Sequence, residues 1–179
     1  MESCFQDQTK AQVLSADTQA LTPYRDSGIF KGTRLLTADG DMPVEYLSDA
    51  DRVITRDQGM CKIRNIRRVF GPVPCVMITA GALGEGQPTE NTLLPAGQLV
   101  LIRIAPKGTR FGFLPVLLPV GQLVDYGVAE HAGIERQNLF QITCDKPHIL
   151  YVQGLEIGTA DAASARAAKA AGPGGSQNR

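Results

Sequence analysis

The stretch SGIFKGTRLLTADGDMPVEYL, residues 27–47, carries the strongest structural signal in this sequence. Its TRLLT portion, residues 33–37, has the residue types of a short strand. The ADGD that follows predicts a tight turn in which Gly40 takes a positive φ. Pro43 is suited to begin a helical turn within PVEYL. A strand, a turn and a helical turn in such close succession favour β structure built from short elements.

Further strand candidates follow along the chain. They are RVITRD, MCKIRNIRRVF, CVMITAGAL and QLVLIRI, separated by segments rich in glycine and proline. FGFLPVLLPVGQLV is apolar but contains Pro115 and Pro119, which predict an edge strand or an extended loop. LFQITC and HILYVQG are expected to form a final hairpin across DKP. Many short strands with intervening turns predict an all-β, barrel-like or sandwich-like fold.

Length and local composition predict one domain with flexible ends. A chain of 179 residues can bury a sufficient hydrophobic core without disulfides or metals. Residues 1–26 form a polar leader without sustained periodicity and are expected to be poorly ordered. The β domain is assigned to residues 27–158. Residues 159–179 form an Ala- and Gly-rich tail that is expected to be mostly mobile, with a short helix from about Ala160.

The charge balance argues against binding to nucleic acid or to a membrane. The formal net charge is zero, so no bulk electrostatic attraction to phosphates or acidic lipids is expected. The densest basic run, Arg64, Arg67 and Arg68, is interpreted as a solvated sheet face. No apolar run reaches the ~18 residues of a membrane span, and the N-terminus lacks the pattern of a secretory signal. A cytoplasmic location is the default prediction, which leaves an unconventional export route open.

The cysteines do not form a recognisable ligand motif. Cys4, Cys61, Cys75 and Cys144 are scattered and contain no CxxC pair, so they are interpreted as small buried hydrophobic residues. We expect no cofactor and no metal from this pattern. An alternative is a metal or hydrolase site built from Cys144, Asp145 and His148, although their spacing is irregular for zinc.

Residues 32–59, GTRLLTADGDMPVEYLSDADRVITRDQG, resemble the opening block of the Hint (hedgehog/intein) domain in the bacterial version common in alphaproteobacteria. In that family a Gly-Thr pair begins a strand, an Asp-Gly turn follows, and a PVExL segment precedes a strand that ends in TRDxG. The glycine that usually precedes Asp51 is Ala50 here.

Later segments match the same family in a consistent order. LLPAGQLVLI is similar to its central T-P-x-H region, VLLPVGQLVDYG to its LVPAxxLVxG segment, and CDKPHILYVQGLEIG to its closing block. The resemblance therefore extends over roughly residues 28–158. It implies an all-β, horseshoe-like fold.

The resemblance also implies a known reaction, for which this chain lacks the side chains. A Cys or Ser at the first position of such a domain attacks the preceding carbonyl, and the matching residue is Gly28. The threonine and histidine of the central motif, which polarise and protonate the scissile amide, match Leu94 and Gly97. The closing histidine matches Pro147, with His148 beside it. The resemblance thus predicts a Hint domain that is degenerate at its self-processing residues.

Two main functions follow from the sequence. The first is a scaffold or interaction module, with an unidentified protein partner and without autoprocessing. The second is active self-processing by atypical residues, with Ser27 as the nucleophile and His148 or His131 assisting.

Overall fold

The computed structural model describes residues 27–103 and 115–162 of the chain. The predicted leader, residues 1–26, and the tail beyond residue 162 lie outside these ranges, so the expected flexibility of both ends stays a prediction. The elements in chain order are β1 (Ile29–Phe30), β2 (Arg34–Thr37), β3 (Gly40–Pro43), η1 (Val44–Tyr46), β4 (Arg52–Thr55), β5 (Gly59–Lys62), β6 (Asn65–Ile78), β7 (Thr92–Pro95), β8 (Leu99–Ile102), β9 (Val116–Pro119), η2 (Val120–Leu123), β10 (Glu130–Thr143), β11 (Ile149–Val152) and β12 (Leu155–Gly158).

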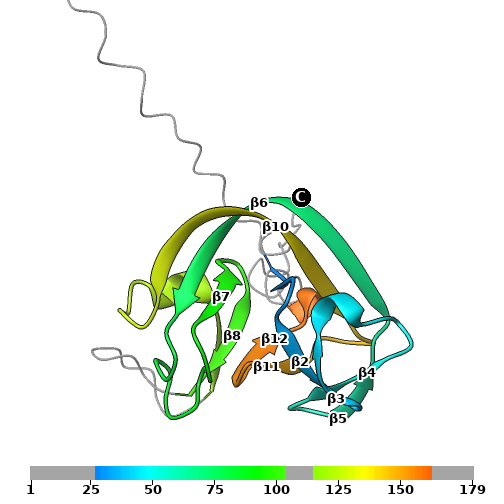
Figure 1. The fold of residues 1–179 in the computed structure, drawn as a ribbon. Helices are drawn as coiled ribbons and strands as arrows, with labels where there is room; N and C mark the ends of the chain where they lie inside the picture. The colour runs from blue at the N-terminus through cyan, green and yellow to red at the C-terminus, as the bar shows by residue number, and fades with distance from the viewer. Residues whose placement is uncertain (1–26, 104–114, 163–179) are drawn as a thin grey trace, which may run out of the picture.

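These strands form two open sheets. One sheet has four strands in the order β1-β10-β6-β7, and the other has eight, in the order β3-β2-β4-β11-β12-β8-β9 with β5 paired to β4. Figure 1 shows the arched outline that results. Strands β6 and β10 form the top of the arch, and the shorter strands form two groups below it. The predicted all-β, horseshoe-like fold is confirmed.

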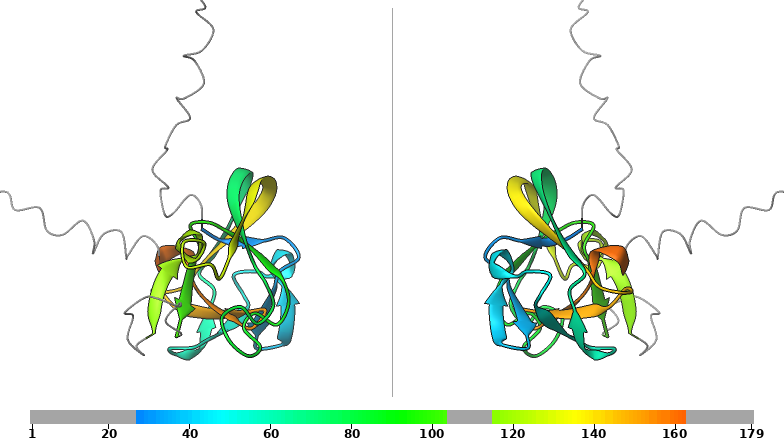
Figure 2. Two further views of the ribbon diagram at one scale, coloured as in Figure 1. Left: turned by 90° about the vertical axis from the view of Figure 1, so that its left-hand side faces the viewer. Right: turned by 90° about the vertical axis from the view of Figure 1, so that its right-hand side faces the viewer.

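Strands β6 and β10 form a long antiparallel arm of 14 residues each. Their ladder runs from Asn65 paired with Thr143 to Met77 paired with Glu130. Pro72 and Pro74 lie within β6, where the sequence suggested an interruption. Because β7 pairs with β6 only from Cys75 onward, both prolines fall where β6 has an edge that needs no second ladder. The middle of the two strands, at the top of the arch, stands above the rest of the molecule in the side views (Figure 2).

The opening block folds as its residues predict. β2 and β3 pair in register from Arg34–Pro43 to Thr37–Gly40, and Gly40 has a φ of +99°. Pro43 then caps the short helical turn η1 in extended conformation. The later proline-containing segment supplies β9, which lies at the edge of the larger sheet, as expected for a strand bounded by Pro119.

The predicted hairpin between LFQITC and HILYVQG is wrong. The LFQITC residues form the end of β10 and pair with β6, where Ile142 lies opposite Ile66. The HILYVQG residues include β11, which instead forms a hairpin with β12 across Gln153 and Gly154. Both of these turn residues have positive φ, of 48° and 80°, which suits a two-residue hairpin turn. The DKP segment therefore connects two different sheets.

A single large hydrophobic cluster joins the two sheets. It includes Leu35 and Val53 from one sheet and Val76 and Ile142 from the other, all nearly inaccessible to solvent. Thr159, Ala160 and Ala162 continue beyond β12 and are also buried. Within residues 27–103 and 115–162, no helix has the length and apolar character needed to cross a membrane.

Candidate functional site

The start of the domain is held against β10 by the short strand β1. Ile29 pairs with Phe140 and Phe30 with Leu139 in antiparallel register. This register brings the preceding residues beside Gln141. The Gln141 side-chain nitrogen donates a hydrogen bond of 2.9 Å to the backbone carbonyl of Ser27, and both residues are buried.

A second glutamine holds the other side of the same peptide bond. Gln98 lies in the connection between β7 and β8, and its Oε1 accepts a hydrogen bond of 2.7 Å from the backbone N–H of Gly28. Its Nε2 donates to the carbonyls of Leu99 at 3.1 Å and Gly158 at 2.8 Å. Both polar groups of the Ser27–Gly28 peptide therefore bind buried amide side chains.

The backbone at Gly28 leaves no room for a side chain. Its φ is +142°, a region that residues with a β carbon rarely adopt. A β carbon built there would lie 2.8 Å from the Leu139 Cγ and 2.9 Å from the Phe140 carbonyl oxygen. A cysteine or serine at this position would require both the backbone and the adjacent β10 residues to move.

The residues matched to the central motif, Leu94 and Gly97, have no side-chain group that could form a hydrogen bond with this peptide. Leu94 is fully buried on β7, opposite Val76. Gly97 lies in the turn after β7, and the residue after it, Gln98, makes the contact with Gly28. The sequence interpretation missed Gln98 and Gln141. Neither glutamine belongs to a motif, and their hydrogen-bonding role becomes visible only in the folded chain.

The closing block positions His148 and not Pro147 toward the interior. Pro147 is exposed, whereas the His148 ring is fully buried. Its Nδ1 lies 2.6 Å from Asp57 Oδ2 and its Nε2 lies 3.1 Å from Asp145 Oδ1. These contacts direct the ring toward the β4–β5 turn and the DKP segment. The other histidine, His131, is an exposed residue of β10.

The two carboxylates determine the protonation of this cluster. Burial lowers the pKa of His148, but the hydrogen bonds to Asp57 and Asp145 outweigh it and leave the pKa raised above its ordinary value. The hydrogen bond from His148 lowers the pKa of Asp145. Loss of hydration opposes a similar decrease at Asp57, whose pKa is nevertheless lowered by the Ile149 N–H and by His148.

A buried thiol completes the cluster. The Cys61 Sγ on β5 lies 3.5 Å from Asp145 Oδ1, the oxygen that also contacts His148. The sequence alternative placed Cys144 with Asp145 and His148, but the structure groups Cys61 with them. Cys144 lies beside Cys61, and burial together with the Cys61 thiol raises the pKa of Cys144. Cys61, Cys75 and Cys144 are all buried, as predicted.

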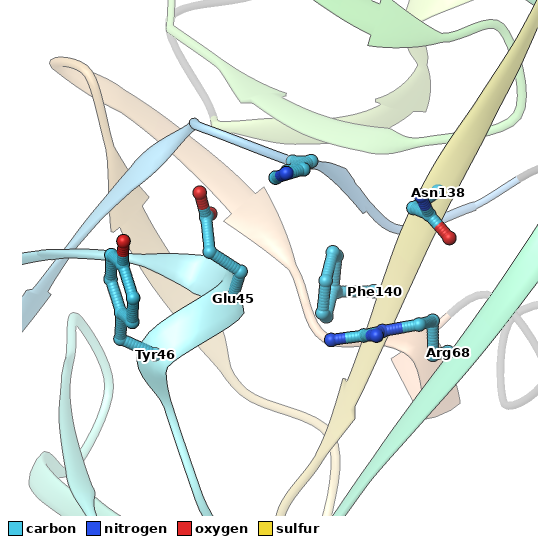
Figure 3. Close-up of a pocket in the computed structure, with 6 residues that line it drawn as sticks. Glu45, Tyr46, Arg68, Asn138 and Phe140 are labelled. Atoms are coloured by element: carbon cyan, nitrogen blue, oxygen red, sulfur yellow. The ribbon is translucent and has the colours of Figure 1, made fainter.

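A separate shallow pocket lies between η1 and the arm. It is lined by Lys31, Glu45, Tyr46, Arg68, Asn138 and Phe140. Figure 3 shows the Arg68 side chain against the Phe140 ring, with Glu45 and Tyr46 on the facing wall. The guanidinium carbon lies 4.9 Å from the ring centroid. The Glu45 carboxylate accepts a 2.8 Å hydrogen bond from the Gly32 N–H, which lowers the pKa of Glu45. The carboxylate is thereby used in holding the β1–β2 turn.

A comparison of the sequence with family models finds one domain, whose bounds agree with those of the fold described above. The Hint domain model matches residues 28–162, beginning at the glycine whose backbone N–H is bound by Gln98. The chain belongs to the Hint domain family. The match starts one residue before β1 and ends in the buried residues after β12.

Several solved structures are similar to this chain over most of their length. A bacterial intein-like domain from Clostridium thermocellum aligns with a TM-score of 0.50 and 14% identity, over 74% of this chain and 97% of that one. The MchDnaB-1 intein aligns with a TM-score of 0.47 and 13% identity, over 73% and 98% of the two chains. The gp41-1 intein aligns with a TM-score of 0.47 and 14% identity, over 73% and 96%. No curated protein matches the sequence.

Proposed function

We propose that this Hint domain lacks autoprocessing activity and serves as a scaffold or interaction module. The observation that carries the proposal is Gly28, the first residue of the matched domain. An acyl shift needs a thiol or hydroxyl beside the scissile carbonyl, and glycine has neither. The positive φ and the close approach of Leu139 and Phe140 also exclude the β carbon that such a side chain requires.

The surroundings of the Ser27–Gly28 peptide support the same proposal. General acid catalysis of amide cleavage needs a group that can transfer a proton to the leaving nitrogen. Gln98 contacts this nitrogen but acts as an acceptor of its hydrogen bond, and an amide side chain is neither a general acid nor a general base at neutral pH. The contact therefore stabilises the intact peptide bond.

The alternative, self-processing through Ser27 and His148, has less support. The His148 ring atoms that would act as base or acid both contact carboxylates, at Asp57 and Asp145. The proposal also includes a bacterial domain of the alphaproteobacterial type, on the strength of the opening block 32–59, together with a cytoplasmic location and a protein partner instead of nucleic acid.

The proposal is tested by incubating the purified full-length protein with dithiothreitol or hydroxylamine and recording its intact mass. These reagents cleave thioesters and esters, so a chain that forms neither should keep its full mass. We expect a single species over days at neutral pH. Appearance of a fragment that ends at Ser27, or at Asp26 if Ser27 itself attacks the preceding carbonyl, would overturn the proposal.

A further inference from the structure

Three side chains with different donor atoms converge beside the β4–β5 hairpin. Cys61 comes from β5, Asp145 from the segment after β10, and His148 from the residue before β11. The Sγ, a carboxylate oxygen and a ring nitrogen of these residues all lie within 4.8 Å of one another. We propose that Cys61, Asp145 and His148 form a binding site for a divalent transition-metal ion, with zinc as the preferred ion.

The spacing of the donor atoms suits a tetrahedral metal. His148 Nε2 lies 3.1 Å from Asp145 Oδ1, and Cys61 Sγ lies 3.5 Å from the same oxygen. With the bond lengths usual for zinc, nitrogen, oxygen and sulfur ligands at tetrahedral angles lie about 3.3–3.6 Å apart. These two distances fit that spacing, and the Cys61 and His148 donor atoms lie within 4.8 Å of each other, so an ion can enter between the three atoms once side-chain rotation brings the sulfur and the nitrogen to that spacing. A thiolate and an imidazole together favour zinc over magnesium or calcium, which prefer oxygen ligands.

Asp57 orients the His148 ring, as carboxylates commonly do for zinc-binding histidines. Asp57 Oδ2 lies 2.6 Å from His148 Nδ1, and Asp57 Oδ1 accepts a 3.1 Å hydrogen bond from the Ile149 N–H. A carboxylate at one ring nitrogen fixes the tautomer and leaves the other nitrogen available as a ligand. Asp57 is thus a positioning residue that orients the His148 ring toward Cys61 and Asp145.

One side of the cluster is open to solvent. The Asp145 and Asp57 side chains are 47% and 40% exposed, whereas the His148 side chain is fully buried. An ion can approach from the Asp145 side, where water can take a fourth position. A set of three protein ligands with one open position is the arrangement of zinc sites that activate water or bind a further ligand.

Two other interpretations of the cluster explain less of it. An imidazolium held between Asp57 and Asp145 accounts for the two ring contacts but not for the Cys61 thiol at the same Asp145 oxygen. A Cys61–His148 nucleophile would need an accessible sulfur, and Cys61 is only 6% exposed. A metal site accounts for all three donors and for Asp57.

The test is a titration of the EDTA-treated, full-length protein, made without a polyhistidine tag, with Co²⁺ under anaerobic, reducing conditions. Cobalt occupies zinc sites and gives a thiolate-to-metal charge-transfer band that reports the sulfur ligand directly. We expect the band to saturate at one equivalent and to disappear when one equivalent of Zn²⁺ is added. A wild-type protein without this band overturns the proposal.

Substitutions assign the ligands. Cys61→Ser should abolish the charge-transfer band, and Asp145→Asn, an exposed and structurally mild change, should weaken Co²⁺ binding at least tenfold. Asp57→Asn should weaken it about 10- to 100-fold, as expected for a second-layer carboxylate. The matched controls, Cys75→Ser and His131→Gln, change a buried cysteine and the second histidine outside the cluster and should retain full binding. A band that persists in Cys61→Ser, or is unaffected by Asp145→Asn, overturns the assignment.

Discussion

The Gln98 side-chain oxygen accepts a hydrogen bond from the backbone N–H of Gly28, with 2.7 Å between oxygen and nitrogen. The same amide donates to the carbonyl of Gly158 at 2.8 Å. One buried side chain therefore connects the residue before β1 with the last residue of β12. At the position where a self-processing relative would break its backbone, this domain has a contact that joins its two ends.

Replacing Gln98 by alanine should destabilise the domain substantially. The substitution leaves the Gly28 N–H and the Leu99 and Gly158 carbonyls without the buried partner that each now has. Because an unsatisfied buried polar group costs about 1–3 kcal/mol, and water can reach some of these groups after the truncation, we expect a loss of about 3 kcal/mol. Urea unfolding measures the change. Gln58→Ala, at an exposed turn residue, serves as the control and should stay within about 0.5 kcal/mol of the wild type. Equal stability of Gln98→Ala and the wild type would contradict the role assigned to Gln98.

Gly28→Ala should be more destabilising than Gly59→Ala, although both glycines have a positive φ. Gly59 has a φ of +78° but open space around a β carbon, so Gly59→Ala should cost only the backbone term, about 1 kcal/mol. Gly28 adds contacts of 2.8 and 2.9 Å to that term, and we expect a total of about 3 kcal/mol. Gly71→Ala, with neither constraint, should be neutral. Urea unfolding of the three variants checks this order, and similar costs at positions 28 and 59 would show that β10 yields readily.

The sequence predicts the framework well because its signals are local. The Asp39–Gly40 turn and the proline before η1 are set by neighbouring residues, and both were predictable. The pairing of β10 with β6 was not, because it depends on contacts between residues far apart in the chain. The hairpin assigned to LFQITC and HILYVQG failed for this reason. A short DKP connection is compatible with a hairpin but does not require one.

The residues of the candidate sites also differ in whether local sequence or only the folded chain reveals them. Loss of the nucleophile was visible at Gly28, since the absence of a side chain needs no structure to detect. The two glutamines were not found, because Gln98 and Gln141 have no motif, and only the folded chain brings them to one peptide bond. Cys61 is 84 residues from Asp145, a separation at which spacing patterns for metal ligands carry no information.

Ser27→Ala should leave the intact mass of the purified protein unchanged apart from the substitution itself. If Ser27 were a nucleophile, wild-type protein would accumulate fragments in hydroxylamine, and the alanine variant would not. Ser27 is buried, and its carbonyl is held by Gln141, which restricts the motion that attack requires. Mass spectrometry of both proteins after identical incubation is the measurement. A wild-type fragment that is absent from Ser27→Ala would favour self-processing.

The stability of the metal-free protein should decrease as pH rises from about 6.5 through the folded-state pKa of His148. The pKa of His148 is raised in the folded state, so the imidazolium contributes stability that is fully present below about pH 6.5 and is lost as pH rises through the folded-state pKa. The lowered pKa values of Asp57 and Asp145 act in the opposite sense. Their contribution is present above about pH 4 and is lost as pH falls through their folded-state values. Urea midpoints measured in EDTA should therefore be highest at mildly acidic pH.

Two histidine variants test the origin of this pH dependence. In His148→Gln the urea midpoint should fall less as pH rises, because the substitution removes the imidazolium that both carboxylates contact. In His131→Gln, on the exposed face of β10, the urea midpoint should fall as in the wild type. A decline that is equally steep in both variants would show that groups other than His148 cause it.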